Sequence, residues 1–317
     1  MKLRIGSRGS QLALWQANHI KALLEDKGHS VTIEIIKTTG DRLQAVTFAQ
    51  VAAQSGTTKG MFTKEIEEAL QEGRVDLAVH SLKDLPTQLP EGFALAATPE
   101  RVDPRDVLVS VKYDDLASLP QGAVVGTSSQ RRRAQLKALR PDIEAVEFRG
   151  NVDTRLRKLA EGQVDAILLA AAGLDRLEKT EWIRQRMEPK DFCPAAGQGS
   201  LGIETREGDD VTLGALKFLD HPDTRYAVTA ERAALAALGG GCQVPIGIHC
   251  RRMLAGDVME IYGVVADPAT GKTIRAHQSA DRAGVAPADL GKRIAERLVE
   301  SGAATLLNGS TEIPAGA

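Results

Sequence analysis

The sequence predicts an α/β protein with two similar doubly wound lobes, followed by a small α+β third domain. Three observations support this prediction. Short apolar runs alternate with helical patterns through the first half of the chain, which is typical of parallel strands joined by crossover helices. Two sequence patterns occur twice in the same order, which indicates a duplicated unit. Beyond about residue 220 the pattern changes to one helix, three strand-like stretches and a closing amphipathic helix.

The composition is that of a globular chain and excludes several classes of protein. The length of 317 residues suits two or three domains. Forty Lys and Arg against 42 Asp and Glu give a net charge of −2, so no overall field attracts nucleic acid or an anionic membrane. Neither a signal-peptide pattern at the start nor an apolar run long enough to span a bilayer is found. We therefore expect a cytoplasmic protein.

The first lobe is expected to comprise residues 1–99 and 200–217. Its predicted strands are LRIG, VTIEIIKTT and VDLAVHS, and its predicted helices begin near Gln11 and near Thr63. The stretch from residue 40 to 60 carries small and polar residues without a firm period. We expect a mobile lid there, with an ordinary surface loop as the alternative.

The second lobe is expected to comprise residues 105–193. Its predicted strands are VLVS, GAVVGTSS, IEAVEF and DAILLAAAG, with helices from about Gln130 to Leu139 and from about Asp153 to Glu161. Pro99 and Pro104 mark the boundary between the lobes, because prolines interrupt helices and central strands alike. The chain is expected to return to the first lobe near PAAGQGSLG, at 194–202.

Two echoes indicate that the lobes are related. The pattern L-x-E-G-x-V-D begins at Leu70 and again at Leu159, and Ser- and Gly-rich turns beginning at Gly6 and Gly126 each link a predicted strand to a helix. Chance could explain either echo alone. Both together in the same order favour a duplication.

The third domain is expected over residues 220–317. Its helix RYAVTAERAALAALGGG leads into the segment GGGCQVPIG, which surrounds Cys242 with glycine. So much glycine suggests a loop that lets the sulfur approach a ligand, although a small buried residue in a glycine turn is an equal alternative. Cys193 and Cys250 lie beside apolar or strand-like sequence and are expected to be structural. No CxxC spacing is present, and no metal site is predicted.

The turn GTSSQRRR is a candidate anion site. Thr127, Ser128 and Ser129 follow a predicted strand and open a helix, where backbone N–H groups and the helix dipole favour an anion. The arginines at 131–133 could add paired hydrogen bonds to carboxylate or phosphate oxygens. The alternative is a solvated helix face with Ser129 as its N-cap, which would hold for at least one of the three arginines.

Further arginines are expected at the same edge. Arg149, Arg155 and Arg176 stand at turns or early in a helix, and parallel strands bring such positions together at their carboxyl ends. Arginines without acidic neighbours in the sequence indicate a ligand with several carboxylates, held in a cleft between the lobes. Nucleic acid is disfavoured because aromatic residues make up only 3% of the chain.

The segment HSLKDLP places Ser81, Lys83 and Asp84 after the buried strand VDLAV, where α/β enzymes carry their chemistry. Asp84 is the candidate acid or base. The alternative is a turn-forming role ahead of Pro86. His80 is expected to be a hydrogen-bonded structural residue.

Taken in order, SRGSQLALWQ, KGMFTKEIE, VDLAVHSLKDLP, GTSSQRRRAQL, FRGNVDTRLRKL, AAAGLDRL, PAAGQGSLGIE and GGGCQVPIG closely resemble the porphobilinogen deaminase family. The match spans essentially the whole chain. The resemblance implies two lobes similar to those of type II periplasmic binding proteins, a third domain, and a monomer. It also implies a dipyrromethane cofactor joined to Cys242 by a thioether.

The resemblance further implies a reaction and a set of site residues. Four porphobilinogen molecules would be condensed head to tail, with release of ammonia, and water would free the linear hydroxymethylbilane. Asp84 would stabilise the cationic azafulvene left when ammonia departs. By the family's pattern, the cofactor or substrate would be bound by Arg8, Ser10, Lys59, Ser81, Lys83, Thr127, Ser128, Ser129, Arg131, Arg132, Arg149, Arg155, Arg176 and Gln198.

One departure and two rival functions remain open from the sequence. Many relatives carry a second lysine shortly before the KGMF motif, but this chain reads VAAQSGTTKG, so no binding role is assigned to Ser55. The lid is also longer than is usual in the family. A non-catalytic binding protein would share the arginines but would have no use for Cys242. A phosphate-recognising transferase would suit GTSSQRRR, yet the chain has no P-loop.

Overall fold

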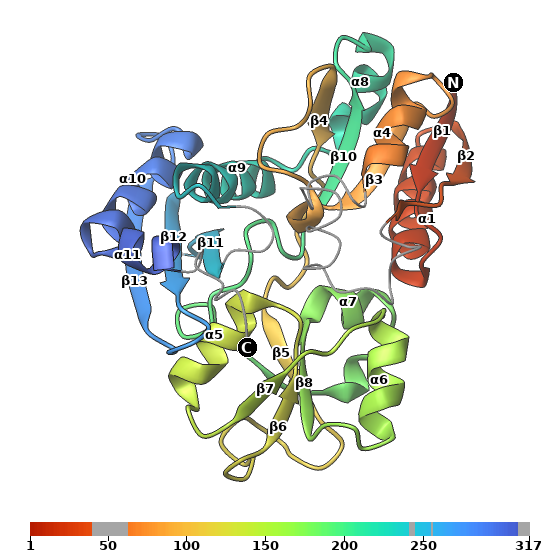
Figure 1. The fold of residues 1–317 in the computed structure, drawn as a ribbon. Helices are drawn as coiled ribbons and strands as arrows, with labels where there is room; N and C mark the ends of the chain where they lie inside the picture. Colours follow the sequence, from red (N-terminus) through yellow and green to blue (C-terminus); the bar gives the residue numbers. More distant parts are fainter. Residues whose placement is uncertain (40–62, 241–244, 255, 310–317) are drawn as a thin grey trace. The chain divides into compact units, whose positions relative to one another are not determined.

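The computed structural model describes residues 1–39, 63–240, 245–254 and 256–309, and the chain divides into two compact units (Figure 1). One unit contains Met1–Val102 and Gly199–Arg225, and the other contains Asp103–Gln198 and Tyr226–Ala317. Each unit is built around its own sheets. The predicted lid at residues 40–60 lies outside the described residues.

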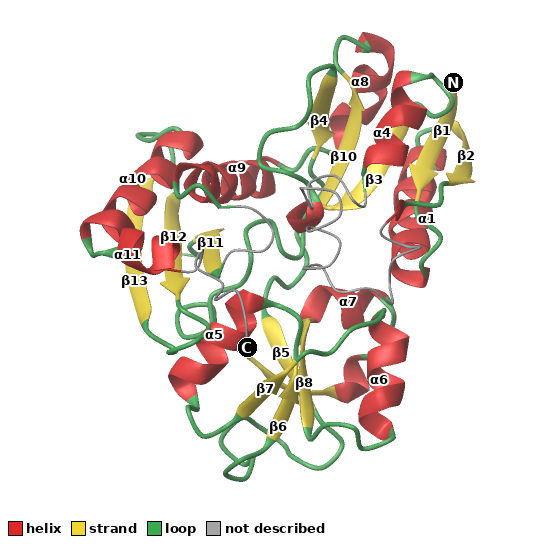
Figure 2. Cartoon of the chain, in the orientation of Figure 1, coloured by secondary structure: helices red, strands yellow, loops and turns green. Residues whose placement is uncertain are grey.

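The first unit contains a five-stranded sheet with helices on both faces (Figure 2). Its strand order is β2 (Ser30–Ile35), β1 (Lys2–Ser7), β3 (Leu77–Ser81), β10 (Leu201–Arg206) and β4 (Phe93–Ala97). Helices α1 (Gln11–Glu25) and α8 (Asp210–Leu216) contribute to the core on one face, and α4 (Lys64–Gln71) packs on the other. Apolar residues of α1 and α4 recur at helical spacing, as in Ile20 with Leu24 and Ile66 with Leu70, and all four are buried.

The second unit contains a sheet with the same arrangement. Its strand order is β7 (Glu144–Val146), β6 (Val124–Gly126), β8 (Ala166–Ala170), β5 (Asp106–Val109) and β9 (Ile183–Arg186). Leu136 of α5 (Gln130–Leu139) enters the core on one face, whereas Leu156 and Leu159 of α6 (Val152–Ala160) enter the core on the other. The short helices α7 (Ala171–Arg176) and η2 (Thr180–Trp182) follow β8.

The two sequence echoes occupy equivalent positions in the two sheets. In each lobe, the aspartate of the V-D pair directly precedes a strand, β3 or β8. This aspartate exchanges hydrogen bonds with the neighbouring parallel strand, β1 or β6. Asp76 accepts from the Arg4 backbone N–H at 2.8 Å, and Asp165 accepts from that of Val124 at 2.8 Å. Both aspartate N–H groups donate back to the same residues. The repeated motif therefore fixes strand pairing in both lobes, as expected of related units.

The second unit also contains the three-stranded antiparallel sheet of the C-terminal domain. Its strands are β11 (Ile246–Arg252), β12 (Val258–Ala266) and β13 (Thr273–Asp281). Helices α9 (Pro222–Ala237), α10 (Pro287–Glu300) and α11 (Ala303–Gly309) accompany this sheet, and their buried residues form one core with it. On its other face, Val264 and Ala266 contact Ala134 of α5 and Cys193. These sheets confirm the expected fold class of two similar α/β lobes and an α+β third domain.

Besides the predicted parallel strands, each lobe contains antiparallel pairs that the sequence did not predict. β5 runs antiparallel to β8 and β9, and β10 runs antiparallel to β3 and β4. β5 and β10 each begin within four residues of a boundary between the units. The chain therefore enters each sheet directly from the crossing, without the crossover helix that a parallel neighbour requires. Strands β4, β9 and β10 and helices α7, α8, α11, η1 (Leu82–Asp84), η2 and η3 (Lys217–Leu219) were not predicted.

Helix α10 approaches α9 so closely that only glycine fits at one position. A Cβ atom added to Gly291 would lie 2.1 Å from the Ala230 carbonyl oxygen and 2.9 Å from the Ala233 Cβ. We expect Gly291→Ala to lower the free energy of unfolding by about 1–3 kcal/mol, because the helices must separate. Urea denaturation would measure the change.

The matched control is Gly214→Ala in α8, where an added Cβ meets nothing within 4 Å. That substitution should raise the free energy of unfolding by about 0.5–1 kcal/mol, since alanine favours the helix. Equal effects of the two substitutions would contradict the close helix contact.

Candidate functional site

In the first unit, the predicted polar residues lie at the carboxyl ends of two adjacent parallel strands. Arg8 and Ser10 follow β1, and Ser81 ends β3. Ser10 is the N-cap of α1, and its hydroxyl accepts from the Ala13 N–H at 3.3 Å. The Ser81 hydroxyl accepts from Gln16 Nε2 at 2.8 Å. The structure thus brings together the residues that the sequence assigned to this edge.

The catalytic candidate lies on a single turn that follows β3. The turn η1 (Leu82–Asp84) is anchored by buried Leu82, whose N–H donates to the Ser200 carbonyl at 3.0 Å. Lys83 is half-buried and Asp84 is exposed. The carboxylate of Asp84 is therefore available to a ligand, while the backbone that carries it is tied to the sheet.

His80 is a structural residue, as expected. Its Nε2 lies 3.0 Å from Glu204 Oε2, and both side chains are almost completely buried. His80 belongs to β3 and Glu204 to β10, so the contact joins two adjacent strands directly before the turn that carries Asp84.

In the second unit, the predicted residues follow three adjacent parallel strands. Thr127, Ser128 and Ser129 follow β6, Arg149 follows β7, and α7, which ends at Arg176, follows β8. Ser129 is the N-cap of α5, and Ser128 donates to the Phe148 carbonyl at 2.7 Å. These residues therefore follow the carboxyl ends of parallel neighbours, which lie at one edge of the sheet.

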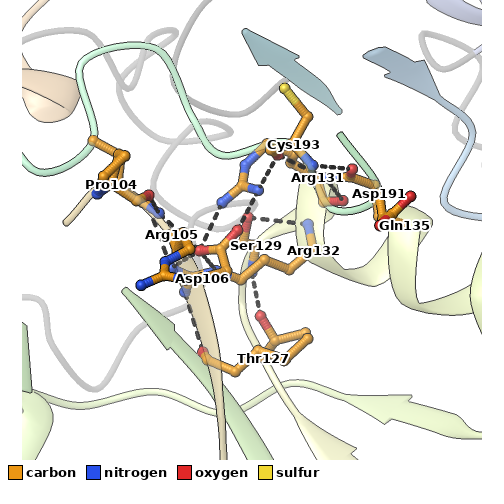
Figure 3. A network of polar contacts seen from close by, with 12 residues as sticks. Pro104, Arg105, Asp106, Thr127, Ser129, Arg131, Arg132, Gln135, Asp191 and Cys193 are labelled. Atoms are coloured by element: carbon orange, nitrogen blue, oxygen red, sulfur yellow. Dashed lines mark hydrogen bonds and ion pairs between the residues drawn. The ribbon is translucent and has the colours of Figure 1, made fainter. Parts of the chain in front are cut away.

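Arg131 and Arg132 form a buried network with Asp106, the first residue of β5 (Figure 3). Arg131 Nη1 donates to Asp106 Oδ2 at 2.6 Å and to the Cys193 carbonyl at 2.7 Å. Arg132 Nε donates to Asp106 Oδ1 at 2.9 Å, and its Nη1 donates to the Leu168 carbonyl at 3.1 Å. The exposed fractions are 4% for Arg131, 6% for Arg132 and 0% for Asp106.

This network corrects the expectation that these arginines have no acidic neighbour. Burial by itself would raise the pKa of Asp106, but the charges of Arg131 and Arg132 outweigh burial and hold that pKa well below its usual range. Asp106 is 25 residues from Arg131 in the chain, so the sequence alone did not pair them. Two guanidiniums against one carboxylate leave one net positive charge in the interior.

Arg133 differs from its two neighbours. Its side chain is partly exposed and lies 3.5 Å from Glu147. The alternative of a solvated helix face therefore holds for this one arginine of the three, and Ser129 is the N-cap that this alternative required.

The remaining arginines add positive charge at the same edge. Burial, together with the charges of Arg132 and Arg149 and against an opposing effect of Glu147, lowers the pKa of Arg155 to about 10. Burial also lowers the pKa of Arg176 to about 10. Both side chains stay protonated at neutral pH. An anion brought to this edge would relieve part of the cost of keeping these charges out of water.

Gln198 contacts the network through its side-chain amide. Its Nε2 donates to Asp106 Oδ1 at 2.9 Å and to the Pro104 carbonyl at 2.7 Å. The segment 193–197, which directly precedes Gln198, is held at its start by Gln135 and at its end by Glu231. Gln135 donates to the Cys193 carbonyl at 2.9 Å and accepts from its N–H at 2.7 Å, and Glu231 accepts from the Gly197 N–H at 2.6 Å.

Glu231, Asp106 and Gln135 are buried polar residues of this region that the sequence did not single out. Glu231 of α9 has no exposed surface and also accepts from the Cys250 N–H at 2.7 Å. In the sequence, Glu231 resembles a polar residue of an amphipathic helix. One sequence feature could have identified Asp106 as a candidate, because it is an acidic residue directly before the apolar run VLV.

The sequence assigned an expected role to each of three cysteines, and the structure describes two of them. Cys193 and Cys250 are buried free thiols, and burial raises the pKa of the Cys193 thiol to about 12, which suits the expected structural role. Cys242 and Lys59 lie outside the described residues.

The two lobes define a class of α/β protein in which each sheet presents polar and cationic side chains at its carboxyl edge. Within the described ranges, no helix is long and apolar enough to cross a membrane.

Comparisons with known proteins agree with this class and extend it. Residues 3–214 match the family model described as the porphobilinogen deaminase, dipyrromethane cofactor binding domain, and residues 225–300 match its C-terminal domain. The chain is 48% identical over 311 residues to a porphobilinogen deaminase of Nitratidesulfovibrio vulgaris, with 96% of each chain covered. It is 49% identical to the enzyme of that name from Albidiferax ferrireducens, with 99% of this chain and 98% of the relative covered.

Among solved structures, the methionine-binding protein MetQ matches with a TM-score of 0.42 and 14% identity, covering 73% of this chain and 94% of that one. The chain belongs to the porphobilinogen deaminase family, whose function lies in tetrapyrrole biosynthesis, and it is an enzyme.

Proposed function

We propose that this enzyme is a transferase that condenses four porphobilinogen molecules head to tail into the linear tetrapyrrole hydroxymethylbilane and releases ammonia at each step. A dipyrromethane cofactor, joined to Cys242 by a thioether, would supply the end to which the first porphobilinogen is added. Family membership supports this reaction.

The observation that carries the proposal is the surplus of buried positive charge in the second unit. Arg131 and Arg132 share a single carboxylate, and burial also lowers the pKa of Arg155. Such charges are costly unless an anion joins them. Each pyrrole unit carries an acetate and a propionate, so a chain of pyrroles supplies several carboxylates. Guanidinium groups can bind these in pairs of hydrogen bonds.

Among the residues at the two sheet edges, Asp84 would act in catalysis and the others would bind the cofactor or substrate. Asp84 is exposed on a turn that is anchored to the sheet, so its carboxylate can face the pyrrole N–H groups and stabilise positive charge that develops on the substrate. It can also accept the proton that is lost after coupling. The binding residues would be Arg8, Ser10, Lys59, Ser81, Lys83, Thr127, Ser128, Ser129, Arg131, Arg132, Arg149, Arg155, Arg176 and Gln198.

The described residues fit a polycarboxylated cofactor. The serine N-caps at Ser10 and Ser129 mark the N-termini of α1 and α5, where free backbone N–H groups favour carboxylates. The arginines of the second unit supply the charge.

Intact-protein mass tests the proposal directly. The wild-type protein should carry an adduct of two pyrrole units, and Cys242→Ser should lack it, because the thioether has no sulfur to form on. Cys250→Ser is the matched control, since Cys250 is a buried free thiol on β11, and it should keep the adduct. An adduct that persists in Cys242→Ser would exclude that attachment point. A wild-type protein that neither carries the adduct nor consumes porphobilinogen would contradict the proposed function.

We further propose that the enzyme is a cytoplasmic monomer, as the family resemblance implies. Sedimentation equilibrium should give the 33.9 kDa mass of one chain, increased only by the adduct. A mass of two chains would contradict the monomer.

A further inference from the structure

Asp106 is a carboxylate that pairs with both buried arginines of α5. It accepts hydrogen bonds from Arg131 at 2.6 and 3.3 Å, from Arg132 at 2.9 Å, and from Gln198 at 2.9 Å. Arg131, Arg132 and Gln198 are all proposed ligand-binding residues, yet Asp106 itself is completely buried. Its role must therefore be exerted through the side chains that it holds.

The contacts of Asp106 fix the orientation of both guanidiniums. A guanidinium is a rigid planar fork, so the two hydrogen bonds from Arg131 to the carboxylate define its plane as well as its position. Arg132 donates one hydrogen bond to Asp106 Oδ1 through Nε, and its Nη2 lies 2.7 Å from the same oxygen. Arg131 Nη1, which already donates to Asp106, also donates to the Cys193 carbonyl, and a further nitrogen of Arg132, Nη1, donates to the Leu168 carbonyl. Both arginines are therefore held before a ligand arrives, which removes the need to order two long side chains on binding.

Asp106 also sets the charge that a ligand encounters. With the carboxylate present, the pair of arginines carries one net positive charge. Without it, two guanidiniums would stand close together without a counterion, and their repulsion would drive them apart. Orientation and spacing of the arginines would be lost together.

We propose that Asp106 is a positioning residue that holds Arg131 and Arg132 in the geometry that binds ligand carboxylates. This inference rests on the proposed function. A residue that acts on binding should change KM more than kcat, because Asp106 does not touch the reacting atoms. A residue that only stabilises the fold should change the amount of active enzyme and leave KM unaltered.

The test compares Asp106→Asn, which keeps the shape but removes the charge, with Asp106→Glu, which keeps the charge. Asp142→Asn is the control, because Asp142 pairs with Arg140 at 2.7 Å in the same lobe but contacts none of the proposed binding residues. Each variant is purified as the full chain. Thermal unfolding, the fraction of protein with the Cys242 adduct, and steady-state KM and kcat for porphobilinogen are measured, with kcat expressed per adduct-bearing molecule.

For Asp106→Asn we expect KM to rise roughly tenfold and kcat to change less than about threefold. We also expect a smaller fraction of adduct-bearing protein than in the wild type. Asp106→Glu should give an intermediate KM, and Asp142→Asn should keep the wild-type KM even if its Tm falls. A KM within twofold of wild type for Asp106→Asn, or an equal rise in Asp142→Asn, would overturn the proposal.

Three further outcomes are also decisive. If Asp106→Asn does not fold, the Asp106→Glu variant decides, and a wild-type KM for that variant overturns the inference. If the wild-type protein lacks both adduct and turnover, the proposed function itself fails. A normal wild-type adduct with an unchanged KM in the Asp106 variants refutes only the positioning role.

Discussion

Replacing Asp84 by alanine is expected to lower the rate of porphobilinogen consumption by about three orders of magnitude and to leave the fold intact. A carboxylate about 4 Å from a positive charge, at an effective dielectric constant near 20, contributes on the order of 4 kcal/mol before desolvation. Each 1.36 kcal/mol corresponds to about tenfold in rate. The side chain is exposed, so its removal leaves no cavity. Consumption of porphobilinogen by adduct-bearing protein is the measurement.

The control for this prediction is Glu91→Ala, which removes another exposed carboxylate from the same unit. Its rate should equal that of the wild type. Thermal unfolding of both variants should stay close to wild type. Near-normal deamination by Asp84→Ala would refute the assignment of Asp84 as the catalytic carboxylate.

Replacing Glu231 by alanine is expected to lower the free energy of unfolding by about 4 kcal/mol and the Tm by roughly 10 °C. The Glu231 carboxylate has no exposed surface and accepts from the Gly197 and Cys250 N–H groups at 2.6 and 2.7 Å. Alanine would leave both backbone donors buried without this acceptor, and each loss of a charge-assisted hydrogen bond is costly. Differential scanning calorimetry would measure the shift.

Glu296→Ala is the control, because Glu296 is an exposed residue of α10 in the same unit. Its Tm should stay within about 1 °C of wild type, as is usual for exposed sites. If Glu231→Ala unfolds at the wild-type temperature, the carboxylate does not hold Gly197 and Cys250 together in solution.

The fold could be predicted from the sequence to the extent that local patterns specify it. The apolar spacing of α1 and the strand-like run of β3 identify these elements without reference to any neighbour. The direction of β5 and β10 was not predictable in this way, because an antiparallel strand and a buried parallel strand have similar apolar sequences. Only the route of the chain between the units decides the direction.

The candidate site likewise contains some positions that the sequence predicts and some contacts that only the structure reveals. Ser10, Ser129 and Asp84 occur at strand-to-helix or strand-to-turn positions that the sequence marks with polar residues, and the structure places them at those positions. For Arg131 and Arg132 the sequence correctly indicated charge at this edge, but it could not identify their counterion.

The sequence by itself determined the two related lobes, the third domain, the family resemblance and the polar residues at each strand end. Adjacent residues specify these features through period, turn chemistry and motif. The tertiary structure decided that Asp106 lies between two guanidiniums and that Glu231 holds Gly197 and Cys250. These contacts join residues 25 to 34 positions apart, or 19 for Cys250, and burial determines their strength, because a charge excluded from water requires a specific partner.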